Sequence, residues 1–259
     1  MCTRVVYSGK NGMVATGRSM DWKTEMHSNL WVFPKGMERN GETGANSLKW
    51  TSKYGSVVTS AFEIASTDGM NEKGLVANLL WLPEAEYPIR DQSKPGLAIT
   101  AWVQYMLDNF ATVDEAVAAI DENTFQVVSD LMPDGSRLAT LHLSISDATG
   151  DCAIFEYTGG KLTVYHSKEY KVMTNSPTYN KQLALNEYWK SIGGLSFLPG
   201  TNRPSDRFVR ASFYINALPQ TDDVRIAIAS VFSVIRNTSV PYGISTPCLL
   251  YTSDAADDL

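Results

Sequence analysis

The fold of this chain starts from the stretch CTRVVYSGKNGMVATGRSMDW at residues 2–22. Two apolar runs flank the turn Gly9-Lys10-Asn11-Gly12, a pattern that predicts a β-hairpin. A second strand that returns from this turn ends beside the start of the first strand. We therefore expect Arg18 and Asp21 to lie alongside Cys2.

Cys2 follows the initiator methionine directly, and removal of Met1 would leave a thiol and a free α-amine on one residue. The ordinary pKa of an α-amine is about 7.7–8.0 and that of a thiol about 8.5. The amine can therefore accept the thiol proton near neutral pH, as in other nucleophiles whose base is their own N-terminus. The positive charge of Arg18 would stabilise the thiolate, and the negative charge of Asp21 would attract the protonated amine.

Composition excludes several other functions. The chain has 259 residues, 44% of them hydrophobic, and a net charge of −6. It has no basic cluster for nucleic acid or an anionic membrane, and no apolar run near the roughly 20 residues that span a bilayer. The three cysteines and three histidines form no metal-binding or disulfide pattern. We therefore expect no metal site and no histidine base.

The order of predicted elements favours an α+β domain. Strands fill the first 82 residues, a helix follows over 97–110, and Thr112 with Glu115 forms a capping box for a second helix. An antiparallel meander is predicted over 137–176. Three more helices complete the pattern, and they are expected at 180–192, 205–218 and 221–237, the last with Thr221 as its N-cap.

Four motifs in order, MCTR, GRSMDW, MTNSPTY and SDRFVRASF, resemble the choloylglycine hydrolase family of N-terminal nucleophile (Ntn) hydrolases. That family includes conjugated bile salt hydrolases and penicillin V acylases. The resemblance runs from Cys2 to about Pro247. It implies a four-layer αββα sandwich, with two antiparallel sheets between helices. It also implies hydrolysis of linear, non-peptide C–N amide bonds without a cofactor.

The resemblance also assigns catalytic roles to five residues. Cys2 matches the nucleophile, and Arg18 and Asp21 match the charged pair beside it. Asn175 matches the asparagine of the oxyanion hole, and Arg207 matches the arginine that completes the charged cluster. From the residues alone, ordinary roles remain open: a surface ion pair, a turn asparagine and a solvated helix face.

Two tryptophans bear on the substrate. Bile salt hydrolases commonly carry Asn where this chain has Trp81, and Trp22 directly follows Asp21. This favours the acylase branch and an aromatic acyl pocket for phenoxyacetyl groups or the fatty acyl chains of N-acyl-homoserine lactones. A conjugated bile salt hydrolase remains an alternative, and so does an inactive relative that binds acylated ligands. Without the family, both tryptophans would be read as core.

The chain is predicted to be one Ntn-hydrolase domain over residues 1–247, incomplete at its C-terminus. Residues 248–259, CLLYTSDAADDL, resemble a translated sequencing adapter, and we expect a non-native tail there. The family also implies a homotetramer acting on a small-molecule substrate. The chain as written predicts a cytoplasmic location, or a periplasmic one if an upstream export signal was lost.

Overall fold

The structure is a computed structural model that describes residues 2–22, 24–120, 124–193 and 196–240. The predicted non-native tail at 248–259 lies outside these residues. The chain divides into two compact units. Unit 1 contains Met1–Thr24, Leu80–Glu84 and Lys168–Leu259, and unit 2 contains Glu25–Leu79 and Ala85–Ser167. The prediction of a single domain over 1–247 stays a prediction.

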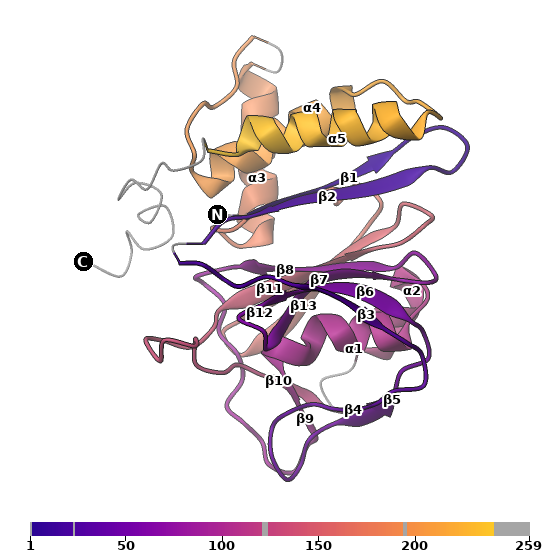
Figure 1. Ribbon diagram of the computed structural model, residues 1–259. Coiled ribbons are helices and arrows are strands. Elements are labelled where there is room, and N and C mark those ends of the chain that lie inside the picture. Colours follow the sequence, from indigo (N-terminus) through magenta and orange to yellow (C-terminus); the bar gives the residue numbers. More distant parts are fainter. Residues whose placement is uncertain (1, 23, 121–123, 194–195, 241–259) are drawn as a thin grey trace, which may run out of the picture. The chain divides into compact units, whose positions relative to one another are not determined.

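Unit 1 has a small antiparallel sheet covered by helices (Figure 1). Its strand order is β14-β1-β2, with β1 at Cys2–Ser8, β2 at Val14–Met20 and β14 at Val172–Met173. The helices of this unit are α3 (Tyr179–Ile192), α4 (Pro204–Ala217) and α5 (Val224–Thr238). Helices α4 and α5 pack against β1, and α3 packs against α4. The predicted hairpin at the N-terminus is therefore confirmed.

The register of this sheet determines which residues can meet Cys2. In the β1–β2 pair, Cys2 lies opposite Met20, and Arg4 lies opposite Arg18. In the β1–β14 pair, Arg4 lies opposite Met173. Continuing that antiparallel register by two residues leads to Asn175 opposite Cys2. Segments far apart in the sequence thus meet at the first residue of β1.

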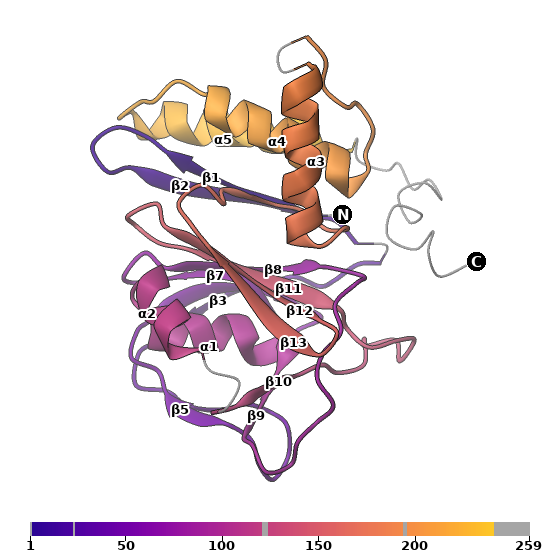
Figure 2. The ribbon, with the colours of Figure 1, turned by 180° about the vertical axis from the view of Figure 1, so that it is seen from behind.

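Unit 2 is built on a seven-stranded sheet of order β13-β12-β11-β8-β7-β6-β3 (Figure 2). Strands β3, β6, β7 and β8 pair antiparallel in succession, as do β11, β12 and β13. The bounds of these strands are β3 Leu30–Phe33, β6 Ser56–Ala61, β7 Ala65–Asn71, β8 Val76–Trp81, β11 Leu141–Ser146, β12 Cys152–Thr158 and β13 Lys161–His166. Strand β8 runs from unit 2 into unit 1 at Leu80.

Shorter elements complete unit 2. The hairpin β4–β5 is antiparallel, and β9–β10 is a parallel pair. The bounds are β4 Glu38–Asn40, β5 Lys49–Thr51, β9 Gly96–Ala98, β10 Gln126–Val128, α1 Trp102–Asn109 and α2 Val113–Ala119, with a 3₁₀ turn η1 at Ile99–Ala101. The long helix predicted over 97–110 therefore begins later, because Gly96–Ala98 pairs with β10 as a strand.

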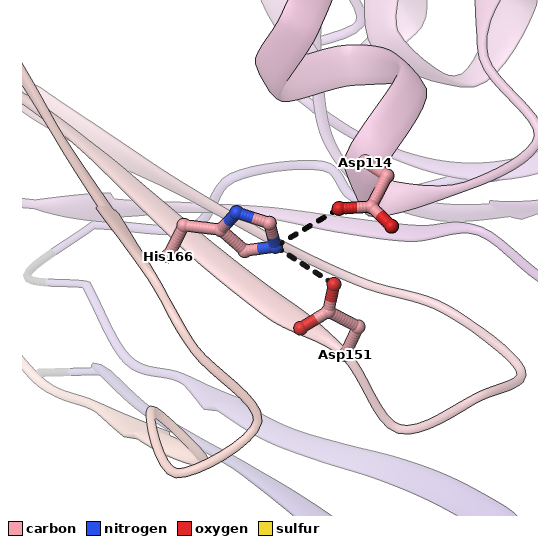
Figure 3. Close-up of side chains that lie close together, drawn as sticks. All are labelled: Asp114, Asp151 and His166. Atoms are coloured by element: carbon pink, nitrogen blue, oxygen red, sulfur yellow. Dashed lines mark hydrogen bonds and ion pairs between the residues drawn. The ribbon is translucent and has the colours of Figure 1, made fainter.

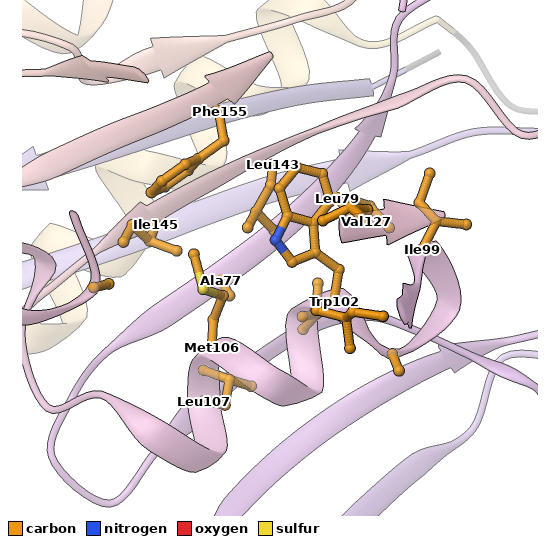
Figure 4. Packing of buried hydrophobic residues seen from close by; sticks show 14 of the residues in the cluster. Ala77, Leu79, Ile99, Trp102, Met106, Leu107, Val127, Leu143, Ile145 and Phe155 are labelled. Atoms are coloured by element: carbon orange, nitrogen blue, oxygen red, sulfur yellow. The ribbon is translucent and has the colours of Figure 1, made fainter. Parts of the chain in front are cut away.

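The main hydrophobic core of unit 2 lies between α1 and the sheet (Figure 4). Trp102 and Met106 of α1 are fully buried against alternate residues of the strands, such as Leu143 and Phe155. Leu143 and Phe155 face each other across β11 and β12. Apolar side chains at every second position of a strand form one face of the sheet, and apolar side chains three or four positions apart form one face of α1. These two apolar faces pack together.

Comparison with the sequence predictions confirms the α+β class and, besides the start of α1, corrects two further details. Residues 172–173 were expected to continue the meander, but they pair with β1 in the other sheet. Thr221 was expected to cap α5, but the N-cap is Asp223, whose side chain accepts from Arg225 N and Ile226 N. Thr112 does cap α2, as predicted, and accepts from Glu115 N at 3.2 Å. Unit 1 combines a three-stranded sheet with helices, and unit 2 combines a seven-stranded sheet and two strand pairs with helices.

Candidate active site

Cys2 and Arg18 form the centre of the candidate site in unit 1. Cys2 is 5% exposed at the start of β1. Arg18 lies diagonally across the β1–β2 ladder on the same face, within reach of a long side chain. Its Nη2 donates to Cys2 Sγ at 3.3 Å. The hairpin predicted from sequence therefore brings these two residues together.

The electrostatic surroundings favour the thiolate of Cys2. Burial alone would raise the pKa of this thiol. The charge and hydrogen bond of Arg18 and the charge of Arg207 act in the opposite direction, and the net effect lowers the pKa below its ordinary value. A lowered pKa increases the fraction of thiolate, the nucleophilic form, near neutral pH.

Asn175 lies in the loop after β14 and contacts the backbone at Cys2. Its Oδ1 accepts from Cys2 N at 3.0 Å and from Arg207 Nη2 at 2.8 Å. Its Nδ2 donates to Trp81 O at 2.7 Å. Rotating the amide by 180° would place an NH₂ group against two donors, so these partners fix its orientation.

Arg207 is fully buried in the first turn of α4. Its Nη1 donates to Cys2 O and, at 2.7 Å, to Thr3 Oγ1. Its Nε donates to Asn202 O at 3.0 Å. Burial lowers its pKa to about 10, although the charges of Cys2 and Asp21 raise it, so the guanidinium remains charged at neutral pH.

Asp21 and the two tryptophans lie at the edge of this group. Asp21 is exposed just after β2, and its charge acts on Arg207. The hydrogen bond that the described residues give Cys2 N goes to Asn175 rather than to Asp21. The rings of Trp22 and Trp81 pack together with centroids 5.1 Å apart at 53°. The sequence-predicted residues thus gather in unit 1.

Sequence reasoning missed two buried polar residues of this group. Thr3 accepts a hydrogen bond from Arg207, and Gln182 of α3 donates to the backbone oxygen of Asn175. Thr3 reads as an ordinary strand residue, and nothing in the sequence distinguishes it. Gln182 lies on the same helical face as Tyr179 and Asn186, which is the buried face of α3. Glutamine is seldom buried, so its place on that face could have marked it as a residue with specific hydrogen-bond partners.

A second cluster of titratable side chains lies in unit 2 (Figure 3). His166 of β13 contacts Asp151 and Asp114 through Nε2, at 2.7 and 3.5 Å. These side chains are of metal-ligand type, and their ligand atoms lie within 4.8 Å of one another. The short contact with Asp151 already gives the imidazole a carboxylate partner. The prediction of no metal site stays a prediction.

Three further buried residues of unit 2, His142, Glu156 and Cys152, lie inside its sheet. His142 and Glu156 are buried and face each other across β11 and β12, with Nδ1 and Oε1 2.9 Å apart. Cys152 is fully buried in β12, as expected for a structural cysteine.

Among the described residues, no helix is both long and apolar enough to cross a membrane.

The geometry of unit 1 is suited to nucleophilic attack. It combines a buried thiol of lowered pKa, a cation on its sulfur, a polar amide at its backbone nitrogen and a second buried cation. Such a thiolate can attack an electrophilic carbonyl carbon, and nearby N–H donors can stabilise the resulting oxyanion.

Comparison with known proteins agrees with this chemistry. The sequence model of the family described as "Linear amide C-N hydrolases, choloylglycine hydrolase family" matches residues 2–249. The chain is 52% identical over 267 residues to the penicillin V acylase of Pectobacterium atrosepticum, covering 95% of this chain and 71% of that protein.

Two solved structures are also similar. The penicillin V acylase from Agrobacterium tumefaciens has a TM-score of 0.88 and 62% identity, over 95% of this chain and 75% of that one. A conjugated bile acid hydrolase from Clostridium perfringens has a TM-score of 0.77 and 27% identity, over 95% of this chain and 82% of that one. Both are Ntn hydrolases, which confirms the predicted fold class.

Proposed function

The chain belongs to the choloylglycine hydrolase family of linear amide C–N hydrolases, and from this premise we propose that Cys2 is the nucleophile of a penicillin V acylase-like enzyme. The observation that carries this proposal is the convergence of Arg18, Asn175 and Arg207 on Cys2. These contacts involve the thiol, the backbone nitrogen and the backbone oxygen of one residue.

The proposed reaction begins after Met1 is removed. The amine of Cys2 takes the thiol proton, and the thiolate attacks the carbonyl carbon of an N-acyl substrate. The C–N bond then breaks as the same amine passes its proton to the leaving nitrogen, which leaves a thioester on Cys2. Water hydrolyses the thioester, releasing the carboxylic acid and restoring the thiol.

The contacts support specific roles for the polar residues. Arg18 stabilises the thiolate, as the 3.3 Å contact and the lowered pKa of the thiol indicate. Asn175 Oδ1 accepts from Cys2 N, the atom that becomes the free amine once Met1 is removed. A free amine carries further N–H bonds, so the role of Asp21 at the amine stays a prediction. Asp21, exposed and within electrostatic range of Arg207, balances the charge of the cluster.

The oxyanion hole is proposed to involve Asn175 and the backbone near Trp81. An NH₂ group carries two N–H bonds, and Asn175 Nδ2 uses one of them on Trp81 O. The second N–H can then donate to the substrate oxygen. The bond to Trp81 O fixes the direction of this donor before substrate arrives, which is how preorganised donors lower an activation barrier.

The acyl group is proposed to be aromatic or aliphatic rather than steroidal. Trp22 and Trp81 pack against each other, and the backbone oxygen of Trp81 accepts from Asn175; such a pair of rings offers an apolar, rigid surface. Phenoxyacetyl and long fatty acyl groups suit that surface. The high identity to two penicillin V acylases supports the first of these.

Parallel assays of three substrates test the proposal. The chain is incubated with penicillin V, a long-chain N-acyl-homoserine lactone and a glycine-conjugated bile salt, and amine release is followed by mass spectrometry. We expect cleavage of penicillin V or the lactone in preference to the bile salt. Preference for the bile salt would move the assignment to the conjugated bile salt hydrolases.

Two cysteine variants provide the controls. Cys2→Ala is expected to abolish turnover, by roughly 10⁴-fold or more, because the nucleophile is lost. Cys152→Ala removes the other buried cysteine of the described residues and is expected to retain activity. Binding of acylated ligands without any cleavage would instead identify an inactive relative.

Assembly and location remain proposals as well. The family resemblance supports a homotetramer, which sedimentation of the purified chain would test. Fractionation of the source cells would distinguish the two locations predicted from the sequence, cytoplasmic and periplasmic.

A further inference from the structure

The loop between β14 and α3 carries Asn175, and it lies outside the strand ladder and outside the helix. The side chain of Asn175 is fixed by Cys2, Arg207 and Trp81. Those bonds orient the amide only if the backbone beneath it stays in place. The loop backbone therefore needs hydrogen bonds of its own, because buried carbonyl groups without donors are costly.

Gln182 provides such bonds from α3. Its side chain is fully buried on the first turns of the helix. Its Nε2 donates to Asn175 O and, at 2.6 Å, to Pro177 O. Its Oε1 lies 3.0 Å from Thr174 Oγ1, and that hydroxyl shares its one hydrogen between Gln182 Oε1 and Pro204 O, which is also 3.0 Å away. One side chain thus contacts the residues on both sides of Asn175 and Asn175 itself.

The chemistry of these contacts requires an amide. Two carbonyl oxygens, those of Asn175 and Pro177, take their donors from this side chain. The reversed amide would place its oxygen against two carbonyl oxygens, so the orientation of Gln182 is fixed. A glutamate would present acceptors to the same carbonyls, and a methionine of similar length would leave both without a donor.

We propose that Gln182 is a positioning residue that holds the backbone of Asn175, so that the Asn175 amide meets the amine of Cys2 and the substrate oxygen. This inference rests on the proposed function of the site. The side-chain hydrogen bonds of Gln182 to described residues go to Thr174, Asn175 and Pro177, so its effect on catalysis is exerted through the Asn175 loop. Helix α3 thereby becomes part of the catalytic framework.

The test is a double-mutant cycle between Gln182→Met and Asn175→Ala, measured with the substrate that wild type cleaves. Gln182→Met alone is expected to lower kcat roughly tenfold to a hundredfold with little change in KM, which is less than removing an oxyanion donor. In the Asn175→Ala background the same change is expected to have almost no further effect on kcat. Equal effects in both backgrounds, or an unchanged kcat, would overturn the proposal.

A matched control separates positioning from loss of stability. Gln104 of α1 is a buried glutamine in unit 2 that donates to Ser56 and Asp108. Gln104→Met is expected to lower the melting temperature as Gln182→Met does, but to leave kcat unchanged. If Gln182→Met does not fold, Thr174→Val tests the same loop. It removes the hydroxyl that lies 3.0 Å from both Gln182 Oε1 and Pro204 O, and it is expected to lower kcat in the same direction.

A further readout distinguishes this proposal from the proposed function. Alkylation of Cys2 by iodoacetamide depends on Arg18, so Gln182→Met is expected to keep the wild-type alkylation rate while kcat falls. If wild type cleaves no acyl amide, the proposed function fails. A crystal structure of Gln182→Met then tests the positioning role of Gln182 without any activity assay. An Asn175 amide displaced from Cys2 N supports positioning, and an unmoved amide overturns it.

Discussion

Each unit buries a charged side chain completely, but the two charges contact different kinds of partner. Arg207 of unit 1 donates to Cys2 O and Asn175 Oδ1, groups at the proposed nucleophile. Asp108 of unit 2 accepts from Trp50 Nε1 at 2.8 Å and Gln104 Nε2 at 2.7 Å. Burial lowers the pKa of Arg207 to about 10 and raises that of Asp108.

The difference shows that burial of a charge does not by itself identify a functional site. Asp108 links α1 to the β4–β5 hairpin, and its partners are structural side chains. Arg207 links α4 to the reactive end of β1. We therefore expect loss of Arg207 contacts to reduce activity first, and loss of Asp108 contacts to reduce stability first.

The largest effect is expected for Arg207→Lys. Lysine keeps the charge but lacks the planar fork that reaches Cys2 O, Thr3 Oγ1 and Asn175 Oδ1 together. We expect kcat to fall on the order of 10²-fold. Steady-state kinetics measure this, with a thermal melt to verify folding. Near-wild-type kcat would show that only the charge of Arg207 matters.

A smaller effect is expected for Arg18→Met, measured by the pH profile of Cys2 alkylation. The thiol pKa is lowered in the wild-type protein, and Arg18 is the largest cause acting in that direction. Without Arg18 the pKa rises, so the midpoint of the profile moves to higher pH. One pKa unit corresponds to roughly tenfold slower alkylation at pH 7. Arg18→Lys serves as the control that retains a charge, and a profile unchanged in Arg18→Met would refute the assignment.

Asp108→Asn is expected to lower stability by about 1–3 kcal/mol with kcat and KM retained, because an NH₂ group then faces the Gln104 donor. Burial raises the pKa of Asp108, so the folded protein binds this proton more tightly than the unfolded chain does. Wild-type stability from this group is present at low pH and is lost as pH rises through the raised pKa. Denaturant unfolding at several pH values tests this, and Asp108→Asn should lack that loss.

The smallest effect is expected for Thr112→Ala in unit 2. The side chain of Thr112 caps α2 by accepting from Glu115 N. Its removal is expected to lower stability by about 1 kcal/mol and to leave activity unchanged. Thr221→Ala is the comparison, since Asp223 rather than Thr221 caps α5. An activity loss in Thr112→Ala would contradict the expectation that structural contacts of unit 2 affect stability and not activity.

The sequence by itself determined the local part of this protein. The Gly9–Gly12 turn and two apolar runs predicted the hairpin that places Arg18 beside Cys2, because a tight turn fixes which residues oppose each other. The family motifs then pointed to Asn175 and Arg207. Helical spacing identified α3 and α4, and a capping box identified the start of α2, since these signals extend over only a few residues.

The tertiary structure alone decided what connects distant segments. It placed β14 beside β1 instead of in the meander, and that pairing leads to Asn175 opposite Cys2. It also gave Gln182 its role beside Asn175, which no local pattern encodes. The physical reason is that strand pairing and buried hydrogen bonds between distant residues depend on the whole fold, whereas turns and caps depend only on neighbours in the chain.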